Sequence, residues 1–116
     1  MTKHEEIRRK SLLKKLVSNA KAIIAEKISM PLGSLEMEKI IYWINQIKPI
    51  TELDLKVFAD FNNQTNDYPI GEDRTNYNKE FLAKLDVKLD DVTLYFKDQI
   101  REKCLEIIKK YSLEES

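Results

Sequence analysis

Residues 85–111, LDVKLDDVTLYFKDQIREKCLEIIKKY, place an apolar side chain at every third or fourth position. Residues at this spacing share one face of an α-helix, so the pattern predicts one long helix whose apolar stripe packs against a core. We therefore expect an all-α protein. The residues of this stripe are Leu85, Leu89, Val92, Phe96, Ile100, Cys104, Ile107 and Tyr111.

A second amphipathic pattern occupies the start of the chain. From Lys3 to Ile28, apolar residues keep helical spacing while lysines occupy the other face, which predicts a long first helix. Pro31 and Gly33 then interrupt the pattern, and both residues are unfavourable inside a helix. We expect the chain to turn at residues 30–34.

A central helix is predicted over residues 35–47. Ser34 is a candidate N-cap, because its hydroxyl can accept a hydrogen bond from an early amide of the helix. The stripe of this helix is almost wholly apolar, and Tyr42 and Trp43 extend it. We expect both aromatic residues in the core, although an exposed tryptophan would be a natural binding anchor.

The middle of the chain predicts short helices and one loop. Thr51 and Asp54 fit a capping pattern that opens a short third helix. Periodicity disappears over residues 62–78, where Asn, Asp, Thr, Pro and Gly dominate, and this marks a long loop. Asn78 can cap a segment over residues 79–85. Either Asp86 then caps a separate final helix, or the two helices run together.

The whole pattern predicts one helical domain over residues 1–116. A chain of 116 residues with 42% hydrophobic side chains is long enough to bury a core without a disulfide or a metal. We expect an all-α bundle of four to five helices, with two long terminal helices and one long loop near residues 62–78.

The sequence lacks the usual signatures of catalysis and cofactor binding. His4 is the only histidine, and Cys104, the only cysteine, falls on the apolar stripe. No Gly-rich phosphate loop, Cys-x-x-Cys or His-Glu-x-x-His motif is present. We therefore expect a protein that is not an enzyme and has no cofactor and no metal. The sequence has no apolar run of about 18 residues, the length that spans a membrane. We therefore expect a cytoplasmic protein that does not contact a membrane.

One segment of the loop is a candidate surface for a protein partner. It combines an aromatic ring, a rigid proline and an arginine that can grip a carboxylate with two parallel hydrogen bonds. An architectural role is the alternative, in which the apolar residues fasten the loop while the arginine caps a helix or pairs with the neighbouring aspartate. The candidate residues are Tyr68, Pro69, Ile70, Glu72, Asp73 and Arg74.

Charge is unevenly distributed along a chain whose formal net charge is zero. Residues 1–27 hold eight basic and three acidic side chains, whereas residues 52–91 hold ten acidic and five basic ones. Clustered lysines bind phosphates without regard to sequence. Nucleic acid is therefore an alternative partner of the first helix, through Lys10, Lys14, Lys15 and Lys21.

Several short stretches of the chain together form a set of motifs that can be compared with known sequences. They are Ala22-Ile23-Ile24, Met30-Pro31-Leu32-Gly33, Met37-Ile40-Ile41, Tyr68-Pro69-Ile70-Gly71 with Arg74, and Leu82 through Leu85-Asp86 to Leu89. With them, residues 12–111 resemble a small bacterial helical family of unknown function. The resemblance implies a bacterial, all-helical domain and assigns no site.

The leading interpretation is a non-catalytic interaction module that binds and regulates or neutralises a protein partner, for example a bacterial immunity or antitoxin-type protein. Two alternatives stay open, namely a nucleic-acid-binding helical protein and an enzyme whose acids near Glu72 and Asp73, with Arg74, converge in a pocket. Self-association is compatible with the first interpretation, because two long amphipathic helices can leave apolar surface for a twofold partner.

Overall fold

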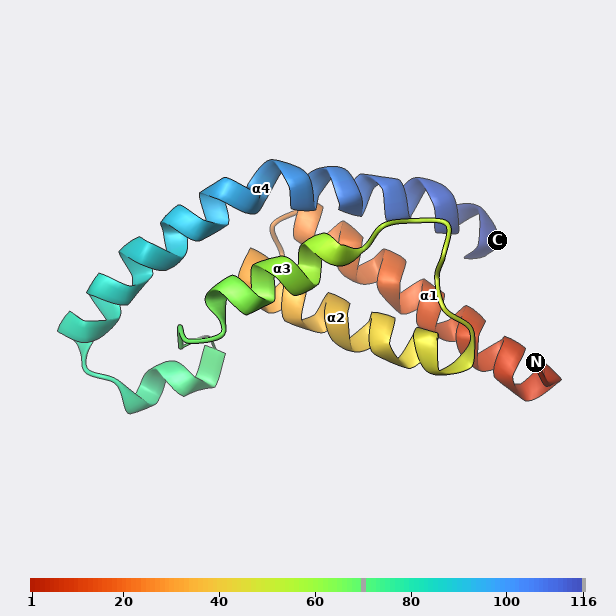
Figure 1. Ribbon diagram of the computed structural model, residues 1–116, viewed down its shortest axis with the longest axis horizontal. Coiled ribbons are helices and arrows are strands. Elements are labelled where there is room, and N and C mark those ends of the chain that lie inside the picture. The colour runs from red at the N-terminus through yellow and green to blue at the C-terminus, as the bar shows by residue number, and fades with distance from the viewer. Residues whose placement is uncertain (70, 116) are drawn as a thin grey trace.

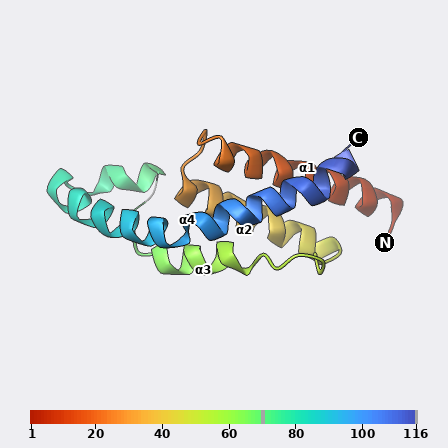
Figure 2. The same ribbon diagram turned by 90° about the horizontal axis from the view of Figure 1, so that it is seen from above.

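The computed structural model describes the backbone of residues 1–69 and 71–115 and the side chains of residues 1–69 and 74–112. Across these residues there is no strand, so the all-α bundle with long terminal helices is confirmed. The helices form a ring in which each packs against the next and α4 packs against α1 (Figures 1 and 2). The elements are α1 (Lys3–Ile24), α2 (Met30–Ile47), α3 (Lys56–Thr65), the 3₁₀ helix η1 (Gly71–Asn76) and α4 (Lys79–Glu115).

Helix α1 opens with a capping box and ends at Ile24, before the predicted end at Ile28. Glu26 adopts a left-handed conformation with φ of 58°. The amides of Glu26 and Lys27 donate to carbonyls of the last helical turn at 3.1 and 2.9 Å. This is the Schellman arrangement, which satisfies the final carbonyls and redirects the chain. The apolar spacing alone does not show this stop.

Helix α2 begins at Met30, earlier than predicted. Ser29 is its N-cap, and the Ser29 hydroxyl accepts a hydrogen bond from a first-turn amide at 3.3 Å. The predicted turn at 30–34 and the predicted N-cap at Ser34 are therefore wrong. Proline is favoured in the first turn of a helix, because the amide that it lacks would have no helical partner there. Pro31 thus starts this helix rather than preventing it.

Helix α3, in contrast, begins later than predicted, at Lys56. The Asp54 carboxylate accepts a hydrogen bond from the Lys56 amide at 3.0 Å, but the N-cap residue makes no side-chain cap bond. The predicted capping pattern at Thr51 is wrong. Helix α3 continues to Thr65, so part of the predicted loop at 62–78 is helical, and η1 lies within the remainder.

Helix α4 forms as one unbroken helix of 37 residues. The Asn78 side chain accepts a hydrogen bond from the Phe81 amide at 2.7 Å, which confirms the predicted cap. Near its middle, the Thr93 hydroxyl donates to the Leu89 carbonyl at 2.8 Å, a bond that tends to bend helices. Figure 1 shows α4 bowed over the bundle, with its first turns projecting past α1, α2 and α3 beside η1. Residues 79–93, before the bend, are here called the α4 arm.

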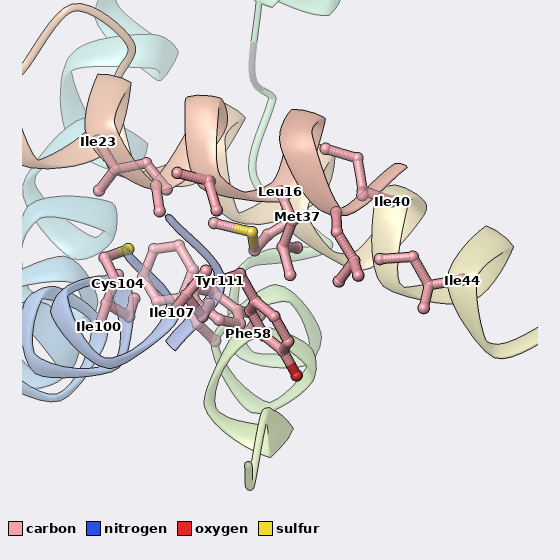
Figure 3. Packing of buried hydrophobic residues seen from close by; sticks show 14 of the residues in the cluster. Leu16, Ile23, Met37, Ile40, Ile44, Phe58, Ile100, Cys104, Ile107 and Tyr111 are labelled. Carbon is pink, nitrogen blue, oxygen red and sulfur yellow. The ribbon is translucent and has the colours of Figure 1, made fainter. Parts of the chain in front are cut away.

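The core lies between the four helices, on the C-terminal side of this bend. Figure 3 shows side chains from all four helices meeting there. Within the predicted stripe of α4, Leu85, Leu89 and Val92 are only half-buried, because they belong to the arm. The buried apolar residues are Leu13, Leu16, Val17, Ala20 and Ile23 of α1, Met37, Ile40 and Ile44 of α2, Phe58 and Phe61 of α3, and Phe96, Ile100, Cys104, Ile107 and Tyr111 of α4.

We expect Gly33→Ala to destabilise the protein. A β-carbon at Gly33 would lie 2.5 Å from Cγ1 and 2.9 Å from Cδ1 of Ile23, so the contact between α1 and α2 would have to open. Overpacking of this kind costs about 1–3 kcal/mol, measurable by urea unfolding followed by circular dichroism. In an Ile23→Ala background, Gly33→Ala should lower the free energy of unfolding by less than it does in the wild type. An equal loss in both backgrounds would show that the clash with Ile23 is not the cause. Exposed Lys39→Ala on α2 is the control.

A hydrogen bond ties the α2–α3 connection to the end of α4. The Tyr111 hydroxyl donates to Oε1 of Glu52, and this bond is the main reason that the pKa of Glu52 lies below its ordinary value. The carboxylate form of Glu52 is therefore favoured by folding. Since Tyr111 is buried in the core, the bond fixes an exposed connection onto a rigid support.

Tyr111→Phe should lower the free energy of unfolding by at most about 1 kcal/mol at neutral pH, because the Glu52 end of the bond is open to solvent. The pKa of Glu52 is lower in the folded than in the unfolded protein, so the stabilisation is complete above the unfolded value of about 4.5 and is lost as the pH falls through the folded value. The difference in the free energy of unfolding between the wild type and Tyr111→Phe should therefore become smaller in acid. Urea unfolding between neutral pH and about pH 3 checks this, and a difference that stays constant would exclude the linkage.

Candidate functional site

The segment that the sequence singles out connects α3 to η1. Pro69 is buried and Tyr68 is half-buried, so this part of the segment is fastened to the bundle. Ile70 lies outside the described residues, as do the side chains of Glu72 and Asp73. The described side chains of the candidate partner surface are therefore those of Tyr68, Pro69 and Arg74.

Arg74 holds η1 against the α4 arm. Its Nη1 and Nη2 atoms donate to Oδ1 and Oδ2 of Asp86 at 2.6 and 2.8 Å. This paired bond raises the pKa of Arg74 and lowers the pKa of Asp86, against a smaller opposing effect of desolvation. The predicted two-bond grip on a carboxylate is confirmed. This carboxylate belongs to α4, and the side chain of Asp73, with which the architectural alternative pairs Arg74, lies outside the described residues.

A groove of about 550 Å³ lies beside this ion pair. One wall is the first turn of α2, and the other is the α4 arm, with the segment before η1 between them. The walls are mostly apolar, and carboxylates of the α4 arm stand at the edge. The residues that form the groove include Met30, Leu32, Pro69, Arg74, Leu89 and Asp90.

The groove continues along α4 toward the end of α1. A second hollow of about 300 Å³ shares Ser29, Met30 and Thr93 with the first, so the two adjoin and are here together called the α2–α4 groove. Glu26, Lys97 and Arg101 line this second part. The groove therefore has Asp90 and the ion-paired Asp86 and Arg74 near one end, two cations with one carboxylate near the other, and an apolar middle.

A separate basic groove of about 340 Å³, here called the α1–α2 groove, lies between α1 and α2. Arg8, Lys15 and Lys39 line it together with Trp43, and the Arg8 guanidinium lies 5.7 Å from the centroid of the Trp43 ring. Trp43 and Tyr42 are 43% and 56% exposed. Their predicted place in the core is wrong, because α2 lies at the side of the bundle and only one face of it is covered.

The lysines predicted to meet nucleic acid do not gather at this groove. Lys15 lines it, whereas Lys10 borders a different hollow, beside the start of α1. Lys14 and Lys21 are exposed elsewhere on α1. Lys39, four residues before Trp43 on α2, lines this groove but was not among the lysines predicted from the sequence. That spacing places the two on one face, but only the packing of α1 against α2 joins this face to Arg8.

Four carboxylates line one hollow of about 340 Å³ together with two lysines; these residues are Asp54, Asp60, Glu102, Glu106, Lys56 and Lys103. No cluster of three or more His, Cys, Asp or Glu side chains suited to a metal ion occurs in the described part of the chain. Burial raises the pKa of the Cys104 thiol to about 12, which keeps this cysteine protonated and unreactive. The lowered pKa of Asp86 favours the carboxylate and opposes a general-acid role.

Comparison with protein-family models, curated proteins and solved structures finds no match to this chain. The resemblance to a small bacterial helical family therefore stays a prediction. Among the described residues, no helix has both the length and the apolar character that crossing a bilayer requires.

Arg74→Ala should loosen η1 without unfolding the bundle. Both side chains of the ion pair are more than a third exposed, so the loss of global stability should be small. Chymotryptic cleavage after Tyr77, followed by mass spectrometry, should become faster, because η1 loses its bond to α4. Asp86→Asn should have the same effect and Asp90→Asn should not. Unchanged cleavage in Arg74→Ala would show that the pair does not hold η1.

Proposed function

We propose that the protein is a non-catalytic interaction module that binds a protein partner in the α2–α4 groove. The observation that carries this proposal is the groove itself, an apolar channel built by two helices and edged by separated charges. Pro69 and Arg74, two of the residues that the sequence marks as a partner surface, lie on its wall. Apolar anchors surrounded by charged groups are typical of specific protein interfaces.

The charge order of the groove specifies what its occupant should look like. Asp90 lies near one end beside the ion-paired Asp86 and Arg74, and Lys97 and Arg101 lie near the other end with Glu26, so each end keeps an excess of one charge, negative at the first and positive at the second. An amphipathic segment of a partner protein fits, with apolar side chains in the middle, a basic group toward the acidic end and an acidic group toward the basic end. Residues 86–101 of α4 span about 22 Å, the length of a four-turn helix. Charge complementarity would set orientation and speed encounter.

Binding of this kind regulates or neutralises a partner by covering the segment that occupies the groove. A bacterial immunity or antitoxin-type protein is one form of such a module, and it needs no reactive group of its own. The buried, protonated state of Cys104 supports a role without chemistry.

Nucleic acid is the second candidate partner, and one observation favours it. The α1–α2 groove brings three cations and one exposed indole together, and cationic grooves with aromatic side chains can hold single strands. Glu36 in the same groove and the single tryptophan weaken this alternative. It ranks below protein binding.

A peptide library displayed on phage and selected against the immobilised protein tests the leading proposal. We expect enriched peptides to combine apolar side chains with a basic and an acidic group, and to bind Leu32→Gln about tenfold more weakly, as after removal of one interface anchor. Leu35→Gln is the matched control, since Leu35 is also exposed on α2 but does not line the groove. Fluorescence anisotropy gives both affinities.

Charge reversal supplies a second matched pair. Asp90→Lys should weaken the selected peptides, whereas Asp91→Lys, one residue further along α4 and outside the groove, should not. Peptides that bind all four variants as tightly as the wild type would refute binding in the groove. Salt-sensitive binding of a random single-stranded oligonucleotide that Lys15→Glu abolishes would favour the second candidate instead.

A further inference from the structure

The solvent-facing side of α4 carries apolar side chains that the groove does not use. Leu94 is 72% exposed and Leu105 is 55% exposed, the first close to the bend of the helix. Asp98 and Arg101 lie between them at spacings of four, three and four residues, so these four side chains share one stripe of the helix. Neither Asp98 nor Arg101 belongs to an ion pair between described residues.

The order of these residues is symmetric. Read from either end, the stripe gives leucine, a charge, the opposite charge, and leucine, at the same spacings. When two such stripes run antiparallel about a twofold axis between residues 99 and 100, each Leu94 faces Leu105 of the second copy. Each Asp98 then faces Arg101 of the second copy. Every pair is either apolar with apolar or acid with base, as antiparallel helix pairing requires.

The shape of the molecule leaves this stripe free to meet a second copy. Figure 1 shows α4 bowed outward, with its convex side away from α1, α2 and α3, so two copies can meet near the bend without contact between the rest of the bundles. Tyr95, 73% exposed beside Leu94, lies at the border of the contact. The contact covers about 17 Å of helix, which is small for an interface, so the association should be weak and depend on concentration.

We propose that the protein forms a twofold dimer through the antiparallel packing of residues 94–105 of α4 on the same residues of a second copy. This surface is separate from the α2–α4 groove except at Arg101, which lines the end of that groove. The dimer does not depend on the proposed partner binding. It would present two grooves, related by the twofold axis, on one particle.

Sedimentation equilibrium from about 10 µM to about 1 mM protein tests the dimer. The wild type should move from monomer to dimer over this range and should not form larger species, because a twofold contact closes on itself. Asp98→Arg and Arg101→Asp should each weaken the dimer at least about tenfold, since each places like charges opposite one another twice. The double variant Asp98→Arg, Arg101→Asp should regain wild-type affinity to within about threefold, because the exchanged charges again face their opposites.

Further variants define which residues the dimer needs. Asp91→Arg changes the same charge on the same helix outside the paired residues, and it should leave the dimer intact. Leu94→Glu should abolish the dimer while circular dichroism stays unchanged, since this leucine is exposed. A wild type that stays monomeric throughout, an open series of larger assemblies, or a double variant as weak as the singles would overturn the proposal. Asp98→Arg should leave peptide binding in the groove unaffected, so failure of the dimer is distinguishable from failure of the proposed function.

Discussion

The fold depends on the packing of the C-terminal part of α4 against α1. Ile100, Cys104 and Ile107 of α4 and Leu16 and Val17 of α1 are completely buried, and burial of a large apolar side chain contributes about 1.5–3 kcal/mol. The two helices run antiparallel, which brings the chain termini to the same end of the molecule (Figure 1). Helices α2 and α3 then complete the core against this pair.

The α4 arm is a consequence of that packing. Helix α4 extends past the helices that cover it, so its apolar stripe is only half-covered before the bend. Polar interactions replace core packing there, and the bond between Arg74 and Asp86 holds η1 to the arm. The α2–α4 groove exists because the arm, η1 and the first turn of α2 approach one another without filling the space between them.

Helix α4 therefore meets three different surroundings. Its apolar stripe supplies the core after the bend, with Ile100 at its centre. Before the bend the same side of the helix, at Leu89 and Thr93, lines the groove. Another side, with Leu94 and Leu105, faces solvent and is the surface assigned to the second copy. Because 3.6 residues make one turn, neighbouring residues point to different surroundings, and a substitution at one surface can leave the others intact.

Local spacing along the chain was enough to predict the helical class, the apolar stripe of the final helix, a cap at Asn78 and the ability of Arg74 to grip a carboxylate. These features depend on residues within one or two helical turns of each other, so they can be predicted from the sequence alone. The exposure of Trp43, the choice of Asp86 as the partner of Arg74 and the groove between α2, η1 and α4 arise only in the folded chain. The reason is that each of these depends on which helix faces which, and that follows from where the helices stop, as the left-handed Glu26 illustrates.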